Sequence, residues 1–347
     1  MSRRIRVALL AGGRSSEHDI SVASARSVAE ALDPERYDVV GVAIGRDGRW
    51  QLETGGSSGH VLVPGTGTGP AETLPVPAAA GTLAALGAVD VVFPILHGPF
   101  GEDGTVQGLL ELADVPYVGA GVAGSAVAMD KDLFKKVMRD SGIPVARHHT
   151  IRLGDPVANP FPFPVFVKPA RLGSSVGISK AHDEAELVAA VELARRHDEK
   201  VLVEEFVAGM EVECGVLGNR IPPPVASLPG RIDTLEHEWY DFASKYDDGG
   251  MELVIPPELP EKTIELVQRR AVESFVAGEC EGMARVDFFV RDDGEVVLNE
   301  LNTIPGFTAT SVYAKLFEAS GIPYAELLDR LVALALERHE RRAALEY

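Results

Sequence analysis

The chain has 347 residues, which is long enough for two or three domains with separate cores. Its 52 acidic and 33 basic residues give a formal net charge of −19, which opposes non-specific binding to nucleic acid or to anionic membranes. The two cysteines, Cys214 and Cys280, lie far apart in the sequence and favour a reducing compartment over a disulfide scaffold.

The N-terminal region predicts a strand, a glycine turn, a helix and a second strand. Residues 6–10 form an apolar run that ends at two glycines, residues 21–32 carry apolar side chains at helical spacing, and residues 37–43 form a second apolar run. This order is typical of a doubly wound α/β domain, although the turn lacks the GxGxxG spacing of a dinucleotide site. The first run is too short for a secretory signal and no run approaches a transmembrane span, so we expect a cytoplasmic protein without a membrane partner.

A long polar segment separates this unit from the next strand. Residues 53–80 are rich in Gly, Pro, Ser and Thr, and we expect an irregular, exposed loop. Residues 89–96 are an uninterrupted apolar run of the buried parallel type, followed by the glycine-rich loop 97–104 and a helix over 105–112. The loop therefore falls at the carboxyl end of a strand, where open α/β sheets bind ligands.

The middle of the chain predicts a small α+β unit. A helix opens at residues 129–132 and ends near 141–144; a strand over 163–168, a helix over 183–196 and a strand over 201–205 follow. His148 and His149 have no acidic neighbour in sequence, so we predict that both lie on the surface.

Two patterns in this unit suit a nucleotide. Lys168 ends a strand and precedes a Gly/Ser loop, whose N–H groups and hydroxyls can approach phosphate oxygens while the lysine adds a point charge. A plain β-turn is the alternative, and the order is not that of a Walker A motif. Glu204, with Glu211 further on, can accept hydrogen bonds from adenine and ribose, although spacing alone favours an exposed acidic strand end.

The C-terminal region predicts an antiparallel sheet from about residue 207, with helices over 260–277 and 324–344. Residues 285–290 and 295–301 read as a β-hairpin with a turn at 291–294. The run 212–217 alternates and places Cys214 in the core.

Alternation along this hairpin brings oxygen ligands together. Arg285 and Asp287 share one face of the first strand, and Glu300 and Asn302 share one face of the second. Carboxylates and an amide oxygen of this kind suit Mg²⁺, which binds through one or two carboxylates plus substrate phosphates. A surface hairpin with a solvated acidic face is the alternative.

The order of these patterns resembles that of ATP-grasp enzymes, and within them the D-alanine–D-alanine ligase family. The resemblance spans nearly the whole chain. It rests on Gly12-Gly13, Ser16-Glu17-His18, His97-Gly98, Gly101–Gly104, Met129–Lys131, Lys168-Pro169, Gly173–Gly177, Glu204, Glu211, Tyr240-Asp241, Lys245-Tyr246, Arg285–Asp287 and Glu300–Gly306. It implies an N-terminal doubly wound α/β domain over 1–120, followed by an ATP-grasp fold of two α+β domains over 121–206 and 207–347.

The resemblance also implies a reaction. ATP would phosphorylate the carboxylate of one D-alanine, and the amine of a second D-alanine would attack the acylphosphate to give D-alanyl-D-alanine, a precursor of peptidoglycan. Two Mg²⁺ ions, with Mn²⁺ as a possible substitute, would be held by Asp287, Glu300 and Asn302. Members of this family are commonly homodimers, so we expect a homodimer.

The implied roles of the other residues fall into two groups. On the nucleotide side are Lys131, Lys168, Ser175, Glu204, Glu205, Val207 and Glu211. On the amino-acid side Glu17 would pair with the first ammonium group, oriented by Ser174 and Tyr246. Further contacts would come from Arg285 and the Gly306 N–H at the oxyanion, Ser311 at the second carboxylate, Lys245 beside the transferred phosphoryl group, and His97, which suits a structural turn histidine equally well.

Three alternatives to this function predict different residues. A D-alanine–D-lactate ligase would form an ester from the same acylphosphate, but the pattern Tyr240-Asp-Phe-Ala-Ser-Lys-Tyr246 is the one found in dipeptide-forming members. Another ATP-grasp ligase would not need Glu17 and Tyr246 together. A non-catalytic ATP-binding module would be expected to lose a metal ligand or Arg285, and neither is lost.

Overall fold

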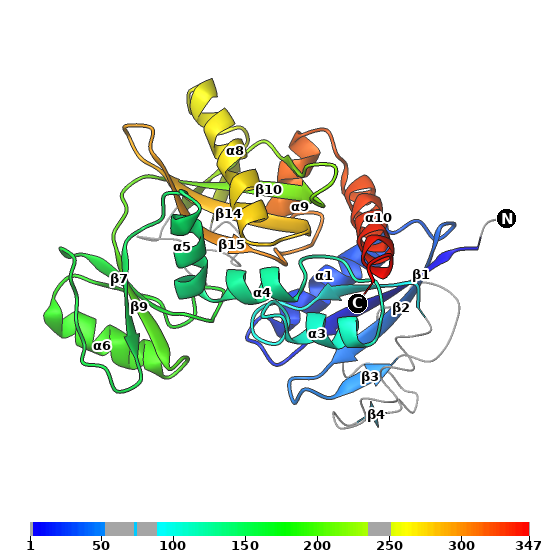
Figure 1. Ribbon diagram of the computed structural model, residues 1–347, viewed down its shortest axis with the longest axis horizontal. Coiled ribbons are helices and arrows are strands. Elements are labelled where there is room, and N and C mark those ends of the chain that lie inside the picture. The colour runs from blue at the N-terminus through cyan, green and yellow to red at the C-terminus, as the bar shows by residue number, and fades with distance from the viewer. Residues whose placement is uncertain (1–2, 53–72, 75–88, 235–250, 347) are drawn as a thin grey trace.

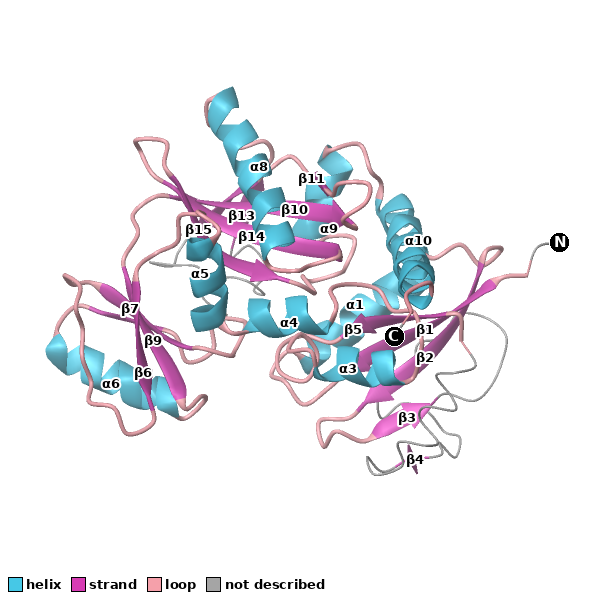
Figure 2. Cartoon of the chain, in the orientation of Figure 1, coloured by secondary structure: helices cyan, strands magenta, loops and turns pink. Residues whose placement is uncertain are grey.

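The computed structural model describes residues 3–52, 73–74, 89–234 and 251–346. In these ranges the chain forms three β-sheets with helices packed against them (Figures 1 and 2). Of the described helices, none is both long and apolar enough to cross a membrane.

The first sheet is mainly parallel, as predicted. Its strand order is β4-β3-β2-β1-β5, in which β1 pairs in parallel with β2 and with β5. The elements are β1 (Ile5–Gly12), α1 (His18–Ala31), β2 (Tyr37–Ile44), β3 (Trp50–Leu52), β4 (Thr73–Leu74), β5 (Val91–Ile95) and α3 (Thr105–Leu112). The turn after β1 requires glycine, because Gly12 has a φ of 95° and a Cβ there would lie 2.2 Å from the Ile44 carbonyl oxygen. Apart from β4, the segment predicted to be an irregular loop lies outside the described residues.

The second sheet is small and antiparallel, with the order β6-β9-β7-β8. The elements are β6 (His148–Arg152), β7 (Val165–Pro169), β8 (Ser179–Ala181), α6 (Glu184–Arg195) and β9 (Lys200–Glu205). Leu187 and Val191 of α6 pack on Val165, Val167 and Val203 of the sheet.

The third sheet carries the predicted hairpin. Its order is β13-β12-β10-β14-β15, with β11 paired to β10. The elements are β10 (Met210–Gly218), β11 (Val225–Ala226), β12 (Gly230–Thr234), β13 (Met251–Val254), α8 (Glu261–Ala277), β14 (Gly282–Val290), β15 (Val296–Asn302) and α9 (Val312–Ala319). Cys214 is fully buried beneath α8 and Cys280 is also buried, and both are free thiols, which confirms the core prediction for Cys214.

Three further helices join the sheets into one body (Figure 1). They are α4 (Val122–Met129), α5 (Lys131–Asp140) and α10 (Tyr324–Ala343). Although α10 ends the chain, its Leu327, Leu331 and Val332 share one core with Val7 and Phe93 of the first sheet. Helix α4 packs against α3, β15 and α5, and α5 also packs against α8, so the two helices lie between the sheets (Figure 1).

Candidate active site

Two adjoining cavities open where the three sheets meet. The larger has a volume of about 380 Å³ and the smaller about 210 Å³, and Glu300 of β15 lines both. Every predicted site residue in the described ranges lines one cavity or the other. The larger holds Glu17, His97, Lys131, Ser174, Arg285, Glu300, Asn302, Gly306 and Ser311; the smaller holds Lys168, Ser175, Glu204, Glu205, Val207, Glu211, Asp287 and Glu300. Lys245 and Tyr246 lie outside the described residues.

The hairpin brings its polar side chains together, as predicted. Arg285 is opposite Asn302 and Asp287 is opposite Glu300, with an irregularity in the pairing after Asp287. Arg285 makes a two-pronged contact with Asp287, at 2.8 and 2.7 Å, and its Nε lies 3.0 Å from Glu213 Oε2. The sequence did not single out Glu213, because its pattern shows only one position of an alternating strand. In the structure, β10 places Glu213 directly opposite Asp287.

The acidic donors fit a magnesium ion completed by phosphates. No group of three or more His, Cys, Asp or Glu side chains in the described part of the chain is arranged to hold a metal ion alone. Asp287 and Glu300, with the Asn302 amide oxygen, provide instead the small oxygen set that Mg²⁺ uses when a nucleotide supplies further ligands. Lys131 Nζ lies 3.5 Å from Glu300 Oε2, so both carboxylates have a cation beside them.

A buried ion-pair cluster lies at the smaller cavity. Glu204 is 2% exposed, with Lys168 Nζ 2.8 Å from one carboxylate oxygen and Lys135 Nζ 3.1 Å from the other. Burial alone would raise the pKa of Glu204, but the two ammonium groups outweigh it and lower that pKa to about 2. The alternative favoured by spacing, an exposed acidic strand end, is therefore wrong for Glu204. Lys135, like Glu213, is a site residue that the sequence did not single out.

Glu205, the next residue, faces the opposite way. Its carboxylate accepts a hydrogen bond from Arg147 Nε at 2.7 Å and one from the Arg147 main-chain N–H at 2.8 Å. Glu205, at the end of β9, and the buried Val207 both line the smaller cavity.

The Gly/Ser loop crosses from the second sheet toward α1. Ser174 and Ser175 have φ angles of 51° and 57°, a left-handed conformation that non-glycine residues rarely adopt and that clusters at functional sites. A Cβ on Gly173 would lie 3.5 Å from Glu17 Oε2, so the loop approaches the Glu17 carboxylate closely. The loop does contain a β-turn, the alternative predicted for it: the Val176 N–H donates to the Gly173 carbonyl oxygen at 3.3 Å, and the two serines are central residues with positive φ, as in a type I′ turn.

The loop after β5 contributes two buried titratable groups. His97 Nδ1 lies 2.9 Å from the Ile304 carbonyl oxygen, while its Nε2 has no hydrogen-bond partner among the described residues. The geometry is compatible with both predicted roles of His97. Its Nδ1 contacts the backbone, as a structural turn histidine would, and its ring lines the larger cavity, as a substrate contact would. Glu102 was part of a motif but had no predicted role; burial, with the nearby Glu17 carboxylate, raises its pKa to about 8.

Ser311 lies at the start of α9 beside the predicted oxyanion donor. Its Oγ accepts a hydrogen bond from the Thr308 N–H at 3.0 Å, and a Cβ on Gly306 would lie 3.3 Å from the same oxygen. Neither α9 nor α4 was predicted.

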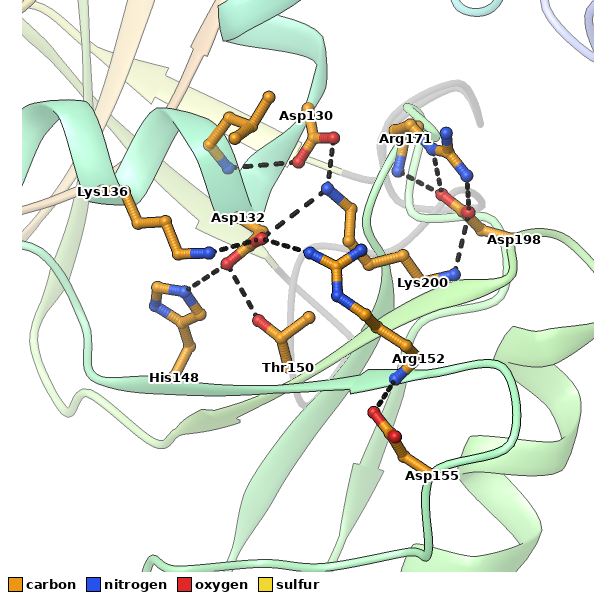
Figure 3. A network of polar contacts seen from close by, with 11 residues as sticks. Asp130, Asp132, Lys136, His148, Thr150, Arg152, Asp155, Arg171, Asp198 and Lys200 are labelled. Carbon is orange, nitrogen blue, oxygen red and sulfur yellow. Dashed lines mark hydrogen bonds and ion pairs between the residues drawn. The ribbon is translucent and has the colours of Figure 1, made fainter.

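A third polar network anchors α5 to the second sheet (Figure 3). Asp132 is fully buried and contacts Lys136 at 2.9 Å, Thr150 at 2.9 Å and His148 at 3.2 Å. The prediction that His148 lies on the surface is wrong, because pairing of β6 with β9 turns its side chain toward an aspartate sixteen residues earlier in the chain. Lys200 of β9 joins Asp130 to this network.

These sheets and cavities define an ATP-grasp fold behind an N-terminal α/β unit. Residues 6–120 match the family profile described as "D-ala D-ala ligase N-terminus", and residues 137–333 match "D-ala D-ala ligase C-terminus". The chain belongs to the D-alanine–D-alanine ligase family.

Individual relatives match this chain over nearly its full length. A D-alanine–D-alanine ligase of Solibacter usitatus is 46% identical and covers 99% of each chain. The structure of the D-alanine–D-alanine ligase from Coxiella burnetii has 35% identity and a TM-score of 0.80, covering 99% of this chain and 97% of its own. The structure of the VanG D-Ala:D-Ser ligase from Enterococcus faecalis has 33% identity and a TM-score of 0.85, and the match covers 96% of this chain and 100% of that chain.

Proposed function

We propose that this chain joins two D-alanine molecules into D-alanyl-D-alanine with ATP, for the synthesis of peptidoglycan precursors. The observation that carries the proposal is the shared wall of the two cavities. Glu300 lines both, so a nucleotide held between Lys168 and Asp287 would direct its terminal phosphate toward the space beside Glu17, Gly306 and Ser311. The family membership names the substrates that fit this arrangement.

The reaction begins with phosphoryl transfer. A carboxylate oxygen of the first D-alanine attacks the terminal phosphorus of ATP, ADP leaves, and an acylphosphate remains. Lys131 and Lys168 place positive charge beside the transferred group, where positioning and charge stabilisation provide most of the rate enhancement. Mg²⁺, when held by Asp287, Glu300 and Asn302, neutralises phosphate charge.

Peptide-bond formation follows in the larger cavity. The amine of the second D-alanine attacks the acyl carbon, and the tetrahedral intermediate collapses to dipeptide with release of phosphate. Arg285 and the Gly306 N–H stabilise the oxyanion, and Glu17 holds the first ammonium group. Ser311 at the start of α9 receives the second carboxylate, since helix N-termini favour anions.

The remaining parts of the proposal rest on the resemblance alone. They are the roles of Lys245 and Tyr246, the homodimer, the use of two metal ions and the domain boundaries near residues 120 and 206. A cytoplasmic location agrees with two buried free thiols.

The experiment is phosphate release from MgATP with D-alanine alone, then with D-lactate or D-serine added, with the products identified by mass. D-serine is included because a structural neighbour is named a D-Ala:D-Ser ligase. D-alanyl-D-alanine as the main product supports the proposal. An ester product would replace it with the D-alanine–D-lactate alternative, and no phosphate release with any acceptor would overturn ligase activity on D-alanine.

A further inference from the structure

Lys135 takes part in a closed ring of four groups behind the nucleotide cavity. Its Nζ lies 3.1 Å from Glu204 Oε2 and donates a hydrogen bond to the Asn299 carbonyl oxygen at 3.2 Å. Lys168 contacts the same two residues, Glu204 Oε1 at 2.8 Å and Asn299 Oδ1 at 3.5 Å. The ring therefore joins four elements, α5, β7, β9 and β15, at the residue before Glu300.

The two lysines differ in exposure. The Lys135 side chain is 1% exposed, whereas that of Lys168 is 10% exposed and lines the smaller cavity. Lys135 thus lies behind the cavity wall and meets the nucleotide only through its neighbours.

The charge balance of Lys135, Lys168 and Glu204 indicates a role for Lys135. Lys168 and Glu204 alone form a neutral pair, in which the carboxylate cancels the charge that a phosphate would meet. With Lys135 on the other oxygen, two ammonium groups share one carboxylate and the trio carries one net positive charge. In a buried site this surplus charge is poorly screened, so it acts on the nucleotide phosphates at short range.

We propose that Lys135 is a positioning residue for the nucleotide, which offsets the Glu204 carboxylate and leaves the charge of Lys168 available to phosphate. The inference rests on the proposed ATP-dependent function. Helix α5 can hold Lys135 in place because Asp132, one turn earlier, anchors the helix to the second sheet (Figure 3).

The test is calorimetric binding of a non-hydrolysable ATP analogue with Mg²⁺ to the full chain. K135M is expected to raise the Kd about tenfold or more, since truncating one member of a buried charge pair weakens binding strongly. The KM for D-alanine is expected to stay within about twofold, because Lys135 acts on the nucleotide side. K135Q keeps a donor for the Asn299 carbonyl but loses the charge, and we expect the same loss.

A double variant separates charge from packing. K135M/E204Q leaves Lys168 as the one charge of the trio, so its net charge returns to one positive and the Kd is expected to recover most of the loss. R139M is the matched control, because Arg139 is a cation on the same helix at an exposed position. Unchanged affinity in both K135M and K135Q would overturn the proposal, as would a double variant that binds as weakly as K135M. A wild-type chain that does not bind the analogue would instead overturn the proposed function and the role of Lys135 with it.

Discussion

Glu102, in the loop after β5, accepts a hydrogen bond at 3.0 Å from the main-chain N–H of Ile304, which is 202 residues further along the chain. Its other carboxylate oxygen accepts from the Gly98 N–H at 2.7 Å. With His97 on the Ile304 carbonyl oxygen, two side chains of the N-terminal unit hold both polar groups of one residue between Asn302 and Gly306. The first sheet thereby sets the position of backbone that the third sheet brings to the site.

E102Q is expected to change how stability depends on pH. The pKa of Glu102 is raised from 4.5 to about 8 in the folded chain, chiefly by burial. A carboxyl with a raised folded pKa adds stability that is complete below its unfolded pKa and is lost as the pH rises through the folded value. Wild-type Tm should therefore fall between pH 5 and pH 8.5 by more than the Tm of E102Q, which has no proton to lose.

Thermal unfolding followed by circular dichroism across this pH range measures the difference. E30Q is the control, because Glu30 is an exposed glutamate on α1 and its loss should leave the wild-type pH profile intact. Parallel profiles for wild type and E102Q would mean that Glu102 keeps an ordinary pKa and that its two hydrogen bonds compensate for burial.

R285M and R285K test the oxyanion role of Arg285. R285M is expected to lower kcat about 10²- to 10³-fold, as loss of one oxyanion donor does in other enzymes. R285K should fall between R285M and wild type, because an ammonium cannot reproduce the two-pronged contact with Asp287 and the contact with Glu213. Steady-state phosphate release gives kcat and KM for each variant. R269M, at an exposed position of α8, is the control, and a loss confined to KM would contradict the oxyanion role.

Sequence patterns predicted the elements that carry a long apolar run or helical spacing. The runs at 37–43 and 285–290 correspond to β2 and part of β14, and the helical segment at 105–112 corresponds to α3. The convergence of Arg285, Asp287, Glu300 and Asn302 followed from alternation within each strand, whereas the pairing of Asp287 with Glu300 depends on a register shift after Asp287 that alternation does not predict.

Residues that depend on contacts distant in sequence escaped prediction. Lys135 reads as one more charge on a polar helix, and only the packing of α5 against β9 and β15 makes it a buried ion-pair partner. His148 lacked an acidic neighbour in sequence and found Asp132 through the β6–β9 pairing. Glu213 and Glu102 needed the opposite strand and the Ile304 backbone to show their roles.

D132N is expected to destabilise the chain and to weaken nucleotide binding together. Burial alone would raise the pKa of Asp132, but hydrogen bonds from Lys136, Thr150 and His148 hold it well below its usual range. Removing this buried negative charge leaves the cations of the network without their shared partner, which costs about 3 kcal/mol of unfolding free energy. Urea unfolding at pH 7 measures the loss, and D140N, an exposed position on the same helix, is the control.

The stability difference between wild type and D132N should also depend on pH. Because the folded pKa of Asp132 is depressed, its contribution is present above the unfolded pKa and is lost as the pH falls toward the folded value. The stability gap between wild type and D132N should therefore narrow on acidification. A gap that is constant from pH 7 to pH 3 would mean that Asp132 contributes through shape rather than charge.

E300Q is expected to separate the metal requirement from nucleotide binding. Glu300 lines both cavities and pairs with Lys131 at 3.5 Å, so its carboxylate is placed to meet a cation at the phosphates. Replacing it with an amide removes one of the two charged oxygen donors, and the Mg²⁺ concentration for half-maximal phosphate release should rise about tenfold, with a lower kcat. Chelation with EDTA should abolish activity in both proteins, and added Mg²⁺ or Mn²⁺ should restore it.

The matched control is E295Q, since Glu295 lies at the other end of the same hairpin and pairs with Arg291 at the surface. E295Q should follow the wild-type Mg²⁺ titration. An E300Q chain with the wild-type Mg²⁺ dependence would remove Glu300 from the metal site, and the pairing of Asp287 with Glu300 across β14 and β15 would then serve to hold Arg285 and Lys131 in place.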